Sequence, residues 1–438
     1  MMLSGWGRYP WAACHVIRPR DEDALRAALA DGPAIARGNG RAYGDSAMHP
    51  RSTLDMRGFE RMLDFDPGSG VLVAEAGVIL GDIISTFLPR GWFPLVTPGT
   101  KFVTLGGMLA ADVHGKNHHR DGSMRACVDW IEVMGPDGCV ERLRPGEERF
   151  DWTLGGMGLT GLILRAAIRL QRVESGWIRQ TLIPAADLDA AMEAFEAHAG
   201  ARYSVAWIDC LSPAPALGRS LVMLGEHAAR DELPQTHGGA PFVVPRRRAL
   251  RVPLDAPAFL LSGPLIRAFN ALHHARGSRA AGTRLVDWDS YFYPLDALLG
   301  WNRIYGRRGF VQFQCALPLD ASRDGLSAML RRIATAGQGA FLAVLKRFGP
   351  GEGRFSFPME GYTLALDFPV NRRSLALLDE LDRITIDHGG RFYLAKDARM
   401  SATTMRAADP RAEGFAAMRR EQGLHSAFAS AQSERLAL

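Results

Sequence analysis

The residues best able to carry chemistry are gathered in one short stretch, DVHGKNHH, which spans residues 112–119. His114, His118 and His119 fall within six residues of one another, and such a group suggests a metal site. However, no acidic residue stands at a ligand spacing such as HExxH, and Lys116 would repel a cation. The pattern therefore argues against zinc or iron.

A glycine-rich segment leads into this stretch. The turn Pro98-Gly99-Thr100 is followed by Thr104 and the pair Gly106-Gly107. A helix that begins near Gly106 would present free backbone N–H groups to a pyrophosphate. We therefore expect an anionic ligand at the start of this helix, with the His, Lys and Asn side chains about two turns later.

Two further glycine clusters could bring the backbone close to a ligand. Residues 36–45, ARGNGRAYGD, follow a short β-like run, so their N–H groups could turn toward an anion or form an ordinary turn. Residues 155–161, GGMGLTG, contain GxGxxG, but residues 162–170 alternate like a strand and no acidic residue stands about 20 positions later. This excludes a Rossmann site, while the glycines remain possible cofactor contacts.

Two parts of the chain, each built of strands and helices, must position these residues. Up to Gly161, short strands at 34–36, 71–74 and 128–134 alternate with helices at 22–30 and 80–88, which indicates an α+β unit. Near Glu174 the composition changes, and we expect a domain boundary there. Beyond it we predict an antiparallel sheet with helices on one face, with strands at 202–208, 309–314 and 361–368 and helices at 187–198, 323–336 and 373–388.

The composition is that of an ordinary globular protein. Hydrophobic residues make up 47% and charged residues 23% of the 438 residues, and the 47 Gly and 25 Pro show no period. These values exclude disorder, collagen and coiled coil. The 52 Lys and Arg against 47 Asp and Glu leave a net charge of only +5, so we expect no nucleic-acid partner.

The cysteines and the apolar runs bear on the location of the protein. Five widely spaced cysteines without a CxxC pair indicate a reducing compartment. No apolar stretch is long enough for a signal peptide or a membrane span. Residues 241–282 combine a basic run, 246–251, with an apolar stretch, 257–266, and such a segment is able to lie on an anionic membrane surface.

Together, the three glycine clusters resemble the FAD-binding domain of the vanillyl-alcohol oxidase superfamily. Within it, the order GWGR (5–8), GRAYGD (40–45), DVHGKNHH (112–119) and GLTG (158–161) resembles the decaprenylphosphoryl-β-D-ribose 2′-oxidase family. The resemblance continues through YPLD (293–296), KRFGP (346–350) and AKDAR (395–399). It is weakest over residues 241–282.

The resemblance implies a two-domain α+β flavoprotein, with an FAD-binding domain at 1–174, a substrate-binding domain at 175–390 and a return to the FAD-binding domain at 391–438. FAD should be noncovalent, because Arg41 stands where covalent members of the superfamily carry His. The residues expected to contact FAD are Arg37, Gly38, Asn39, Gly40, Arg41, Ala42, Tyr43, Pro98, Gly99, Thr100, Thr104, Gly106, Gly107, Asp112, His114, Gly115, Lys116, Asn117, Gly158, Gly161 and Lys396.

The same resemblance suggests a catalytic group of Lys396, His114, Tyr43 and Lys346, with Lys396 beside the flavin. Taken singly, a surface lysine, a helix-capping His or a packed Tyr would be the ordinary interpretation. The resemblance does not identify the general base. The residues expected to contact the substrate are Trp207, Gln312, Gln314, Lys346, Thr363 and Ala365. Mycobacterial members carry Cys at the position of Ala365 and Asn at that of Thr363, so substrate detail is open.

The activity implied is oxidation of the ribose 2′-hydroxyl of a polyprenyl-phosphoryl sugar, the first half of epimerisation to the arabinose form. An NAD(P)H-dependent keto-sugar reductase would complete it, and the protein would be cytoplasmic and peripherally bound to the inner membrane. Two alternatives remain: an oxidase of a soluble sugar, alditol or aldonolactone, which the same fold supports, and a noncatalytic flavoprotein that relays electrons.

Overall fold

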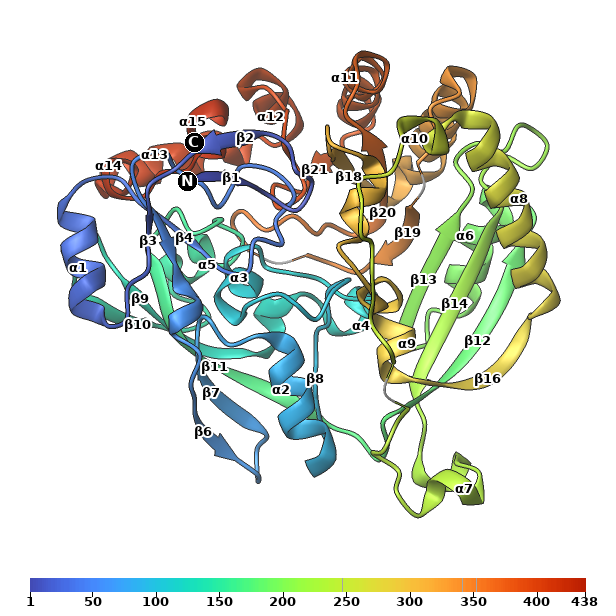
Figure 1. Cartoon of the computed structure of the whole chain (residues 1–438), viewed down its shortest axis with the longest axis horizontal. Coiled ribbons are helices and arrows are strands. Elements are labelled where there is room, and N and C mark those ends of the chain that lie inside the picture. Colours follow the sequence, from blue (N-terminus) through green and yellow to red (C-terminus); the bar gives the residue numbers. More distant parts are fainter. Residues whose placement is uncertain (246, 341, 352) are drawn as a thin grey trace.

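A computed structural model describes residues 1–245, 247–340, 342–351 and 353–438 of the chain. Arg246, the first residue of the basic run noted above, lies outside the described residues. The strands form one sheet of six and one of eight, with three small sheets beside them (Figure 1). All strand pairs within the two large sheets are antiparallel, which confirms the α+β class.

The six-stranded sheet is built around β11, the long alternating run predicted to be a strand after the third glycine cluster. Its strand order is β10-β9-β11-β7-β6, and β8 pairs with the far end of β11. The strands are β6 (Met62–Asp66), β7 (Val71–Glu75), β8 (Trp92–Pro94), β9 (Val128–Met134), β10 (Val140–Leu143) and β11 (Leu162–Arg172). Each glycine cluster lies close to a strand end, where the chain turns back toward the molecule's centre.

Smaller sheets support the first glycine cluster. In the parallel sheet β3-β5-β4, the strand β4 leads directly into residues 38–45. The strands of this sheet are β3 (Val16–Ile17), β4 (Ile35–Arg37) and β5 (Thr53–Asp55). A second small sheet pairs β1 (Met2–Ser4) with β2 (Trp11–Ala13), and a third pairs β15 (Leu250–Arg251) with β17 (Leu298–Leu299).

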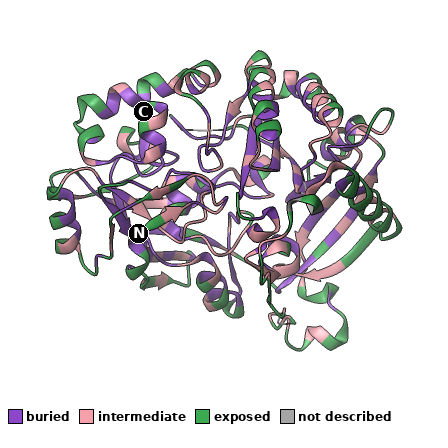
Figure 2. Cartoon of the chain, turned by 45° about the horizontal axis from the view of Figure 1, so that its top comes forward, coloured by how far each residue is buried: buried purple, intermediate pink, exposed green. Residues whose placement is uncertain are grey.

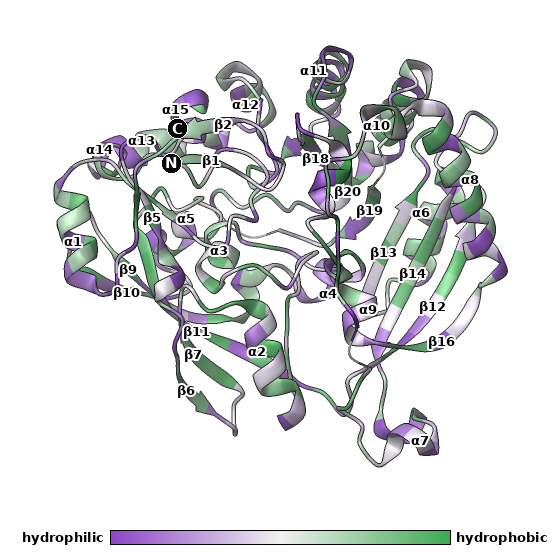
Figure 3. Ribbon diagram, viewed as in Figure 1, coloured by the Kyte–Doolittle hydropathy of each residue, from purple (hydrophilic) through white to green (hydrophobic). Residues whose placement is uncertain are grey.

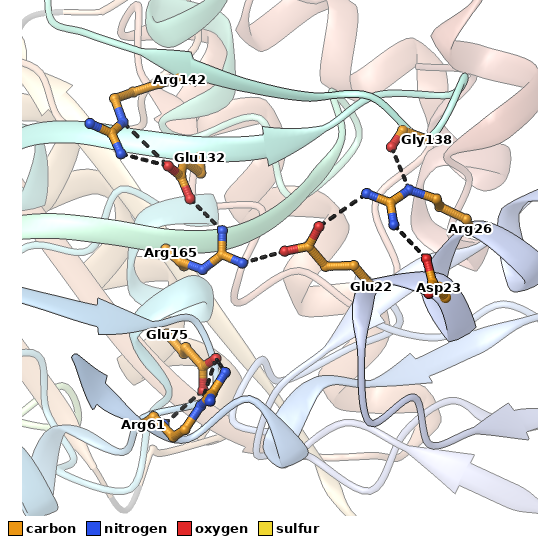
Figure 4. A network of polar contacts seen from close by, with 9 residues as sticks. All are labelled: Glu22, Asp23, Arg26, Arg61, Glu75, Glu132, Gly138, Arg142 and Arg165. Atoms are coloured by element: carbon orange, nitrogen blue, oxygen red, sulfur yellow. Dashed lines mark hydrogen bonds and ion pairs between the residues drawn. The ribbon is translucent and has the colours of Figure 1, made fainter.

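The helix α1 (Glu22–Ala30) forms where its acidic start predicted it, and the side chain of Asp21 caps its N-terminus by accepting from Ala24 N. Figure 4 shows how charged side chains join this helix to the six-stranded sheet. Arg165 pairs with both Glu22 of the helix and Glu132 of β9, and Arg142 also pairs with Glu132 at 2.7 Å. The network holds α1 against the strands that lead into and out of the glycine clusters.

The eight-stranded sheet has the order β16-β12-β14-β13-β19-β20-β18-β21. Its register places Gln314 opposite Ala365 and Gln312 opposite Asp367, and Lys346 lies opposite Thr363. The strands are β12 (Trp177–Ala185), β13 (Tyr203–Ile208), β14 (Ser220–His227), β16 (Gly282–Asp287), β18 (Phe310–Pro318), β19 (Ala343–Phe348), β20 (Gly361–Pro369) and β21 (Arg391–Phe392).

Helices cover both faces of this sheet, so the prediction of helices on one face is only partly correct. Cys315 of β18 points to α10, where its Sγ lies 3.9 Å from Met329 Sδ, and Gln314 points the opposite way. Because Trp207 shares the face of Gln314 and contacts His273, α8 lies on that second face. On this second face, α8 covers the part of the sheet around Trp207, and His114 of the N-terminal half lies against Gln314.

The predicted helices all form, with boundaries shifted by a few residues, and that at 323–336 begins four residues earlier. The helices not yet delimited are α2 (Leu80–Phe87), α3 (Leu105–Ala110), α4 (His118–Asp121), α5 (Glu148–Thr153), α6 (Leu188–Ala197), α7 (Gln235–Gly238), α8 (Gly263–Arg279), α9 (Trp288–Phe292), α10 (Leu319–Ala336) and α11 (Arg372–Asp387). Within the described ranges, no helix has the length and apolar character to cross a bilayer.

The C-terminal helices lie beside the N-terminal strands (Figure 1). They are α12 (Ala402–Ala408), α13 (Arg411–Glu421), α14 (Leu424–Ala427) and α15 (Ala431–Leu436). Phe428 forms a parallel bridge with Ala34, and the buried Arg419 donates to Leu159 O at 3.1 Å. Figure 2 shows the central strands mostly buried, with exposed residues on the outer turns of the helices.

Candidate active site

The three glycine clusters meet in the folded chain. Asn39 Nδ2 donates to Phe102 O at 2.8 Å, which joins the first cluster to the second. Gly38 lies so close to the second that a Cβ would be 2.1 Å from Thr104 Oγ1. Met157 N donates to Ala110 O at 2.8 Å, which joins the third cluster to the end of α3.

The prediction of free N–H groups at the start of α3 is wrong. Leu105 N donates to Val78 O and Gly106 N to Ala76 O, at 2.8 and 2.7 Å, because the first turn of the helix packs against residues 76–78. The N–H of Gly107 is bonded to Thr104 Oγ1 at 3.3 Å. No donor of this turn is left for a phosphate.

Free donors lie instead in the loops. Among the described residues, the backbone N–H groups of Gly40, Arg41, Ala42, Gly99 and Thr100 have no hydrogen-bond acceptor. The positive φ of 63° at Gly40 turns the first loop back on itself. A ligand with phosphate oxygens would satisfy such donors, so the loops fit the pyrophosphate of FAD better than the helix does.

Several residues expected to touch the cofactor use their side chains to hold these loops. Arg37 donates to Ser4 O at 2.8 Å, and Thr100 Oγ1 donates to Asp296 at 2.8 Å. Asn117 Nδ2 donates to Leu95 O at 2.8 Å. Gly161 lies against β9, where a Cβ would be 2.4 Å from a methyl of Val133, so that glycine serves packing.

Asp112 has a similar supporting role. Its fully buried carboxylate accepts from Ser123 Oγ at 2.9 Å and from Arg125 N at 3.0 Å, and Ser356 Oγ also donates to it. Asp112 has φ 38°, an unusual value for a residue with a side chain. These bonds fix the turn that carries His114 two residues later.

Lys396 and Tyr43 are brought together as the resemblance implied. The Lys396 Nζ lies 3.8 Å from the centroid of the Tyr43 ring, and Tyr43 N donates to Ala395 O at 2.9 Å. Burial lowers the pKa of Lys396 below its ordinary value, Asp367 opposes this effect, and Lys346 adds to it. A cation held in this way is weakly solvated and able to act on a ligand beside it.

Asp367 is a site residue to which the sequence analysis gave no role. It is fully buried on β20, accepts from Gln312 Nε2, and leaves its Oδ2 without a hydrogen bond in the described part of the chain. Burial raises its pKa above the ordinary value, while Gln312 and Lys396 lower it. The available signal was an Asp in a mostly apolar strand, two residues after Ala365 and four after Thr363, so that the three share one face.

The hydrogen bonds around Gln314 determine the tautomer of His114. Thr363 Oγ1 donates its proton to Cys315 O at 2.8 Å, so it must accept the 3.2 Å bond from Gln314 Nε2. The same amide nitrogen therefore donates to His114 Nε2 at 3.2 Å, and the ring proton lies on Nδ1. That Nδ1 is buried and has no acceptor within the described residues.

His114 is therefore neutral and presents one free donor. Burial, followed by the nearby Lys346, lowers its pKa well below the ordinary value. Its ring is held among Phe348, Phe357 and Tyr393, with the closest centroid at 4.7 Å. This geometry favours hydrogen bonding to a ligand through Nδ1 and disfavours removal of a proton by this histidine.

Two more lysines extend the site. Burial lowers the pKa of Lys346 to about 8 and that of Lys116 to about 7, with Lys346 adding to the effect at Lys116. Lys116 Nζ lies 4.3 Å from the centroid of the Tyr291 ring and donates to the backbone carbonyl of the same residue. The described residues provide no carboxylate partner within 4.0 Å for either lysine, so this end of the site is suited to an anionic ligand.

Other predicted residues lie apart from this group. Trp207 lies on β13, which is separated from β18 by two strands, and it packs with Leu182 and Leu221 beneath α8. His118 packs against Phe348 beside His114, whereas His119 bonds to Ala201 O at 2.8 Å and so points away from the other two histidines. In the described ranges, no group of three or more His, Cys, Asp or Glu side chains is placed to hold a metal ion.

The site fits FAD by the chemistry of its own atoms. The loops offer free N–H donors for phosphates, and the buried Nε of Arg41 and Nδ1 of His114 also lack protein acceptors within the described residues. The Arg41 guanidinium lies over Trp6 and Phe102, at 4.2 and 5.0 Å from the ring centroids. Lys396 would supply a cation beside a ring that becomes anionic on reduction.

Comparison with known proteins agrees with this interpretation. Residues 13–144 match the FAD binding domain family. Decaprenylphosphoryl-β-D-ribose oxidase of Mycolicibacterium smegmatis is 34% identical over 100% of this chain and 97% of its own length. An uncharacterized protein of Streptomyces coelicolor is 34% identical over 82% of this chain and all of its own length.

More distant relatives match only part of the chain. Alkyldihydroxyacetonephosphate synthase of Trypanosoma brucei brucei is 30% identical over 29% of this chain and 22% of its own length. The similarity to the mycobacterial oxidase, in contrast, includes the eight-stranded sheet. By its full-length similarity and its FAD binding domain, the chain belongs to the decaprenylphosphoryl-β-D-ribose oxidase family and is an FAD-dependent oxidoreductase.

Proposed function

We propose that this protein oxidises the 2′-hydroxyl of a ribose carried on a polyprenyl phosphate, the first half of epimerisation to the arabinose form. The observation that carries the proposal is the similarity to the mycobacterial oxidase over 97% of that enzyme's length. The similarity spans the row of Gln312, Gln314, Thr363 and Asp367 that faces the glycine loops. These polar side chains suit a sugar, and Lys116 and Lys346 suit its phosphate.

The proposed layout has two domains. Residues 1–174 with 391–438 would hold FAD, and residues 175–390 would hold the substrate. Arg41 stands where covalently flavinylated members of the superfamily carry His, which supports a noncovalent cofactor. The loops at 38–42 and 99–100 would hold its pyrophosphate, and His114, Tyr43 and Lys396 would lie against its ring.

Oxidation of a secondary alcohol to a ketone removes a hydride equivalent from carbon and a proton from oxygen. Acceptance of the hydride is the chemistry that FAD supplies when bound. The chain must receive the proton, and we assign this to the buried pair Asp367 and Lys396. Burial favours the neutral form of each partner and their mutual attraction favours the charged forms, so the pair is able to hold or release a proton near neutral pH.

The other polar residues would position the sugar. Gln312 is held by Asp367, and Gln314 by Thr363 and His114, so both amides have fixed orientations. Phe348, Phe357 and Tyr393 enclose this end of the site and exclude water. The ketone product would pass to an NAD(P)H-dependent keto-sugar reductase, which is the partner this reaction needs.

The test is anaerobic stopped-flow absorbance of the flavin-loaded protein mixed with a short-chain polyprenyl-phosphoryl ribose. We expect rapid bleaching of the flavin by this substrate and none by soluble alditols or aldonolactones. Bleaching by a soluble sugar alone would overturn the proposal in favour of a soluble-sugar oxidase. The absence of bleaching by either would favour an electron-relay subunit.

A lipid-linked substrate requires access to a membrane, and we propose that α8 provides it. Leu265 and Leu272 are 47% and 51% exposed, and hydrophobic and hydrophilic residues mix along this helix in Figure 3. No acidic residue occurs between positions 256 and 286, and the described residues provide no ion pair for Arg267 or Arg276. An exposed apolar and cationic surface suits anionic phospholipid.

Sedimentation with phosphatidylglycerol vesicles tests this surface. The double substitution Leu265→Asp with Leu272→Asp should reduce the bound fraction at least tenfold. Leu63→Asp is the matched control, since Leu63 is 43% exposed on β6, on the other large sheet, and should bind like the unaltered protein. Equal binding by the double variant and the control would contradict a role for α8.

A further inference from the structure

The Lys396–Tyr43 contact depends on two chain segments that are far apart in sequence. Tyr43 N donates to Ala395 O at 2.9 Å, which joins the segments directly. Gly44 approaches the carbonyl oxygen of Asp397 so closely that a Cβ would lie 2.1 Å from it. The residues that follow the contact in each segment, Asp45 and Asp397, are both buried carboxylates.

A single arginine from the C-terminal helix α15 joins these two carboxylates. Arg435 binds Asp45 through two nitrogens, with Nη2 at 2.7 Å and Nε at 3.1 Å. Its Nη2 also binds Asp397 Oδ2 at 2.8 Å, and its Nη1 donates to Met400 O at 2.5 Å. Gln432 of the same helix donates to Leu394 O at 2.8 Å.

The charges show why the arginine is needed. Burial alone would raise the pKa of Asp397, but Arg435 and the N–H groups of Arg399 and Met400 hold it below its ordinary value. The pKa of Arg435 is raised by the two carboxylates despite its burial. Without Arg435, two buried negative charges would face each other at the junction of the two segments.

We propose that Arg435 is a positioning residue for the oxidation: by pairing with Asp45 and Asp397 together, it holds the Lys396 ammonium over the Tyr43 ring. This inference rests on the role proposed above for Lys396. Arg435 itself touches neither the sugar-facing row nor residues 38–42 and 99–100, which would hold the pyrophosphate of the cofactor. It acts on Lys396 through the adjacent residue Asp397, and on Tyr43 through Asp45, which lies two residues further along the chain.

The surroundings of Lys396 make its position measurable. The groups that act on it are Asp367 of β20, Lys346 of β19 and the Tyr43 ring, with His114 further along the row. If the two segments separate, Lys396 gains water and loses the burial that lowers its pKa. Its amine should then react faster with a small reagent, and the pH midpoint of that reaction should rise toward the value of an ordinary lysine.

Trace labelling with acetic anhydride over a pH series, followed by mass spectrometry of the Lys396 peptide, tests this in the FAD-loaded protein. Arg435→Gln should increase the limiting rate of Lys396 labelling at high pH, where the amine is fully neutral, about tenfold and raise its pH midpoint by about one unit. Arg399→Gln is the matched control. This substitution lies in the same segment and removes a comparable ion pair, that of Arg399 with Asp382 at 2.6 Å, but Arg399 does not reach Asp45. It should label Lys396 like the unaltered protein.

A milder variant keeps the inference testable if Arg435→Gln does not fold. Asp45→Asn leaves Arg435 on Asp397 and removes only the link to the Tyr43 segment, so it should give a smaller increase in labelling. Unchanged labelling in the folded variants, with only a lowered melting temperature, would overturn the inference. Labelling needs no substrate turnover, so this outcome is distinct from failure of the proposed oxidation.

Discussion

Lys346→Met should make the protein more stable at neutral pH while weakening its binding of substrate. Lys346 is a half-buried cation on β19, and the loss of solvent around its ammonium lowers its pKa from the ordinary 10.5 to about 8. Since each unit of pKa corresponds to about 1.4 kcal/mol, keeping this lysine charged in the folded state costs about 3 kcal/mol. Methionine has a similar shape and no charge, so the substitution removes that cost.

The pH dependence gives the sign of the effect. Between pH 8 and 10.5 the unfolded chain binds a proton at this lysine that the folded protein does not, so the stability of the unaltered protein rises with pH across that window. Below pH 8, the folded protein bears the full free-energy cost of keeping Lys346 charged. The gain from Lys346→Met should therefore be largest at pH 7 and fall by about half or more at pH 9.5.

Urea unfolding followed by tryptophan fluorescence at the two pH values measures both quantities. Lys101→Met is the control, because Lys101 is paired with Asp289 at 2.5 Å and its loss should destabilise the protein at pH 7. A Lys346→Met protein that is less stable at pH 7, or whose gain is the same at both pH values, would refute the reasoning. In turnover assays the variant should show a raised KM, as expected if the cation binds the substrate phosphate.

Three further outcomes are expected. Lys396→Ala should slow flavin reduction by substrate at least about a hundredfold in anaerobic stopped-flow absorbance, since it removes the cation beside the ring, and an unchanged rate would exclude that role. Gln314→Ala should raise KM with kcat retained, whereas Gln314→Glu should also lower kcat, because a carboxylate accepts from His114 Nε2 and would move the ring proton away from Nδ1; equal kinetic constants for both would contradict the assigned tautomer. Acid precipitation should leave the yellow colour in the supernatant, and a yellow pellet would disprove noncovalent FAD.

Local sequence signals were sufficient for the secondary structure near the site. The helix at 22–30 and the strand at 128–134 form with the predicted boundaries, because capping residues and alternation are local properties. The partners of the N–H groups at the start of α3 could not be predicted in the same way. These groups are satisfied by Ala76 and Val78, and a long-range packing contact of this kind leaves no mark on the helix's own sequence.

The site residues also divide into those marked by a local motif and those whose role depends on long-range contacts. The resemblance implied that Lys396, Tyr43 and His114 lie near the flavin and that Gln314 contacts the substrate. The structure brings Lys396 to Tyr43 and Gln314 to His114. Asp367 and Arg435 were missed because their significance depends on partners far away in sequence. A buried Asp in a strand is visible as an anomaly, but the partner that explains it is known only once β20 lies beside the loop of residue 396.

The return of the C-terminal helices to the N-terminal strands has a consequence for synthesis of the protein. Ala34 forms a β-bridge with Phe428, and Asp45 forms an ion pair with Arg435. The first glycine loop therefore lacks these partners while the nascent chain is growing. At about 5–20 residues per second, the ribosome needs roughly 13 to 50 s to move from residue 174 to the last helix. During that interval the first glycine loop is incomplete, so we expect it to bind FAD only after the C-terminal helices have been synthesised.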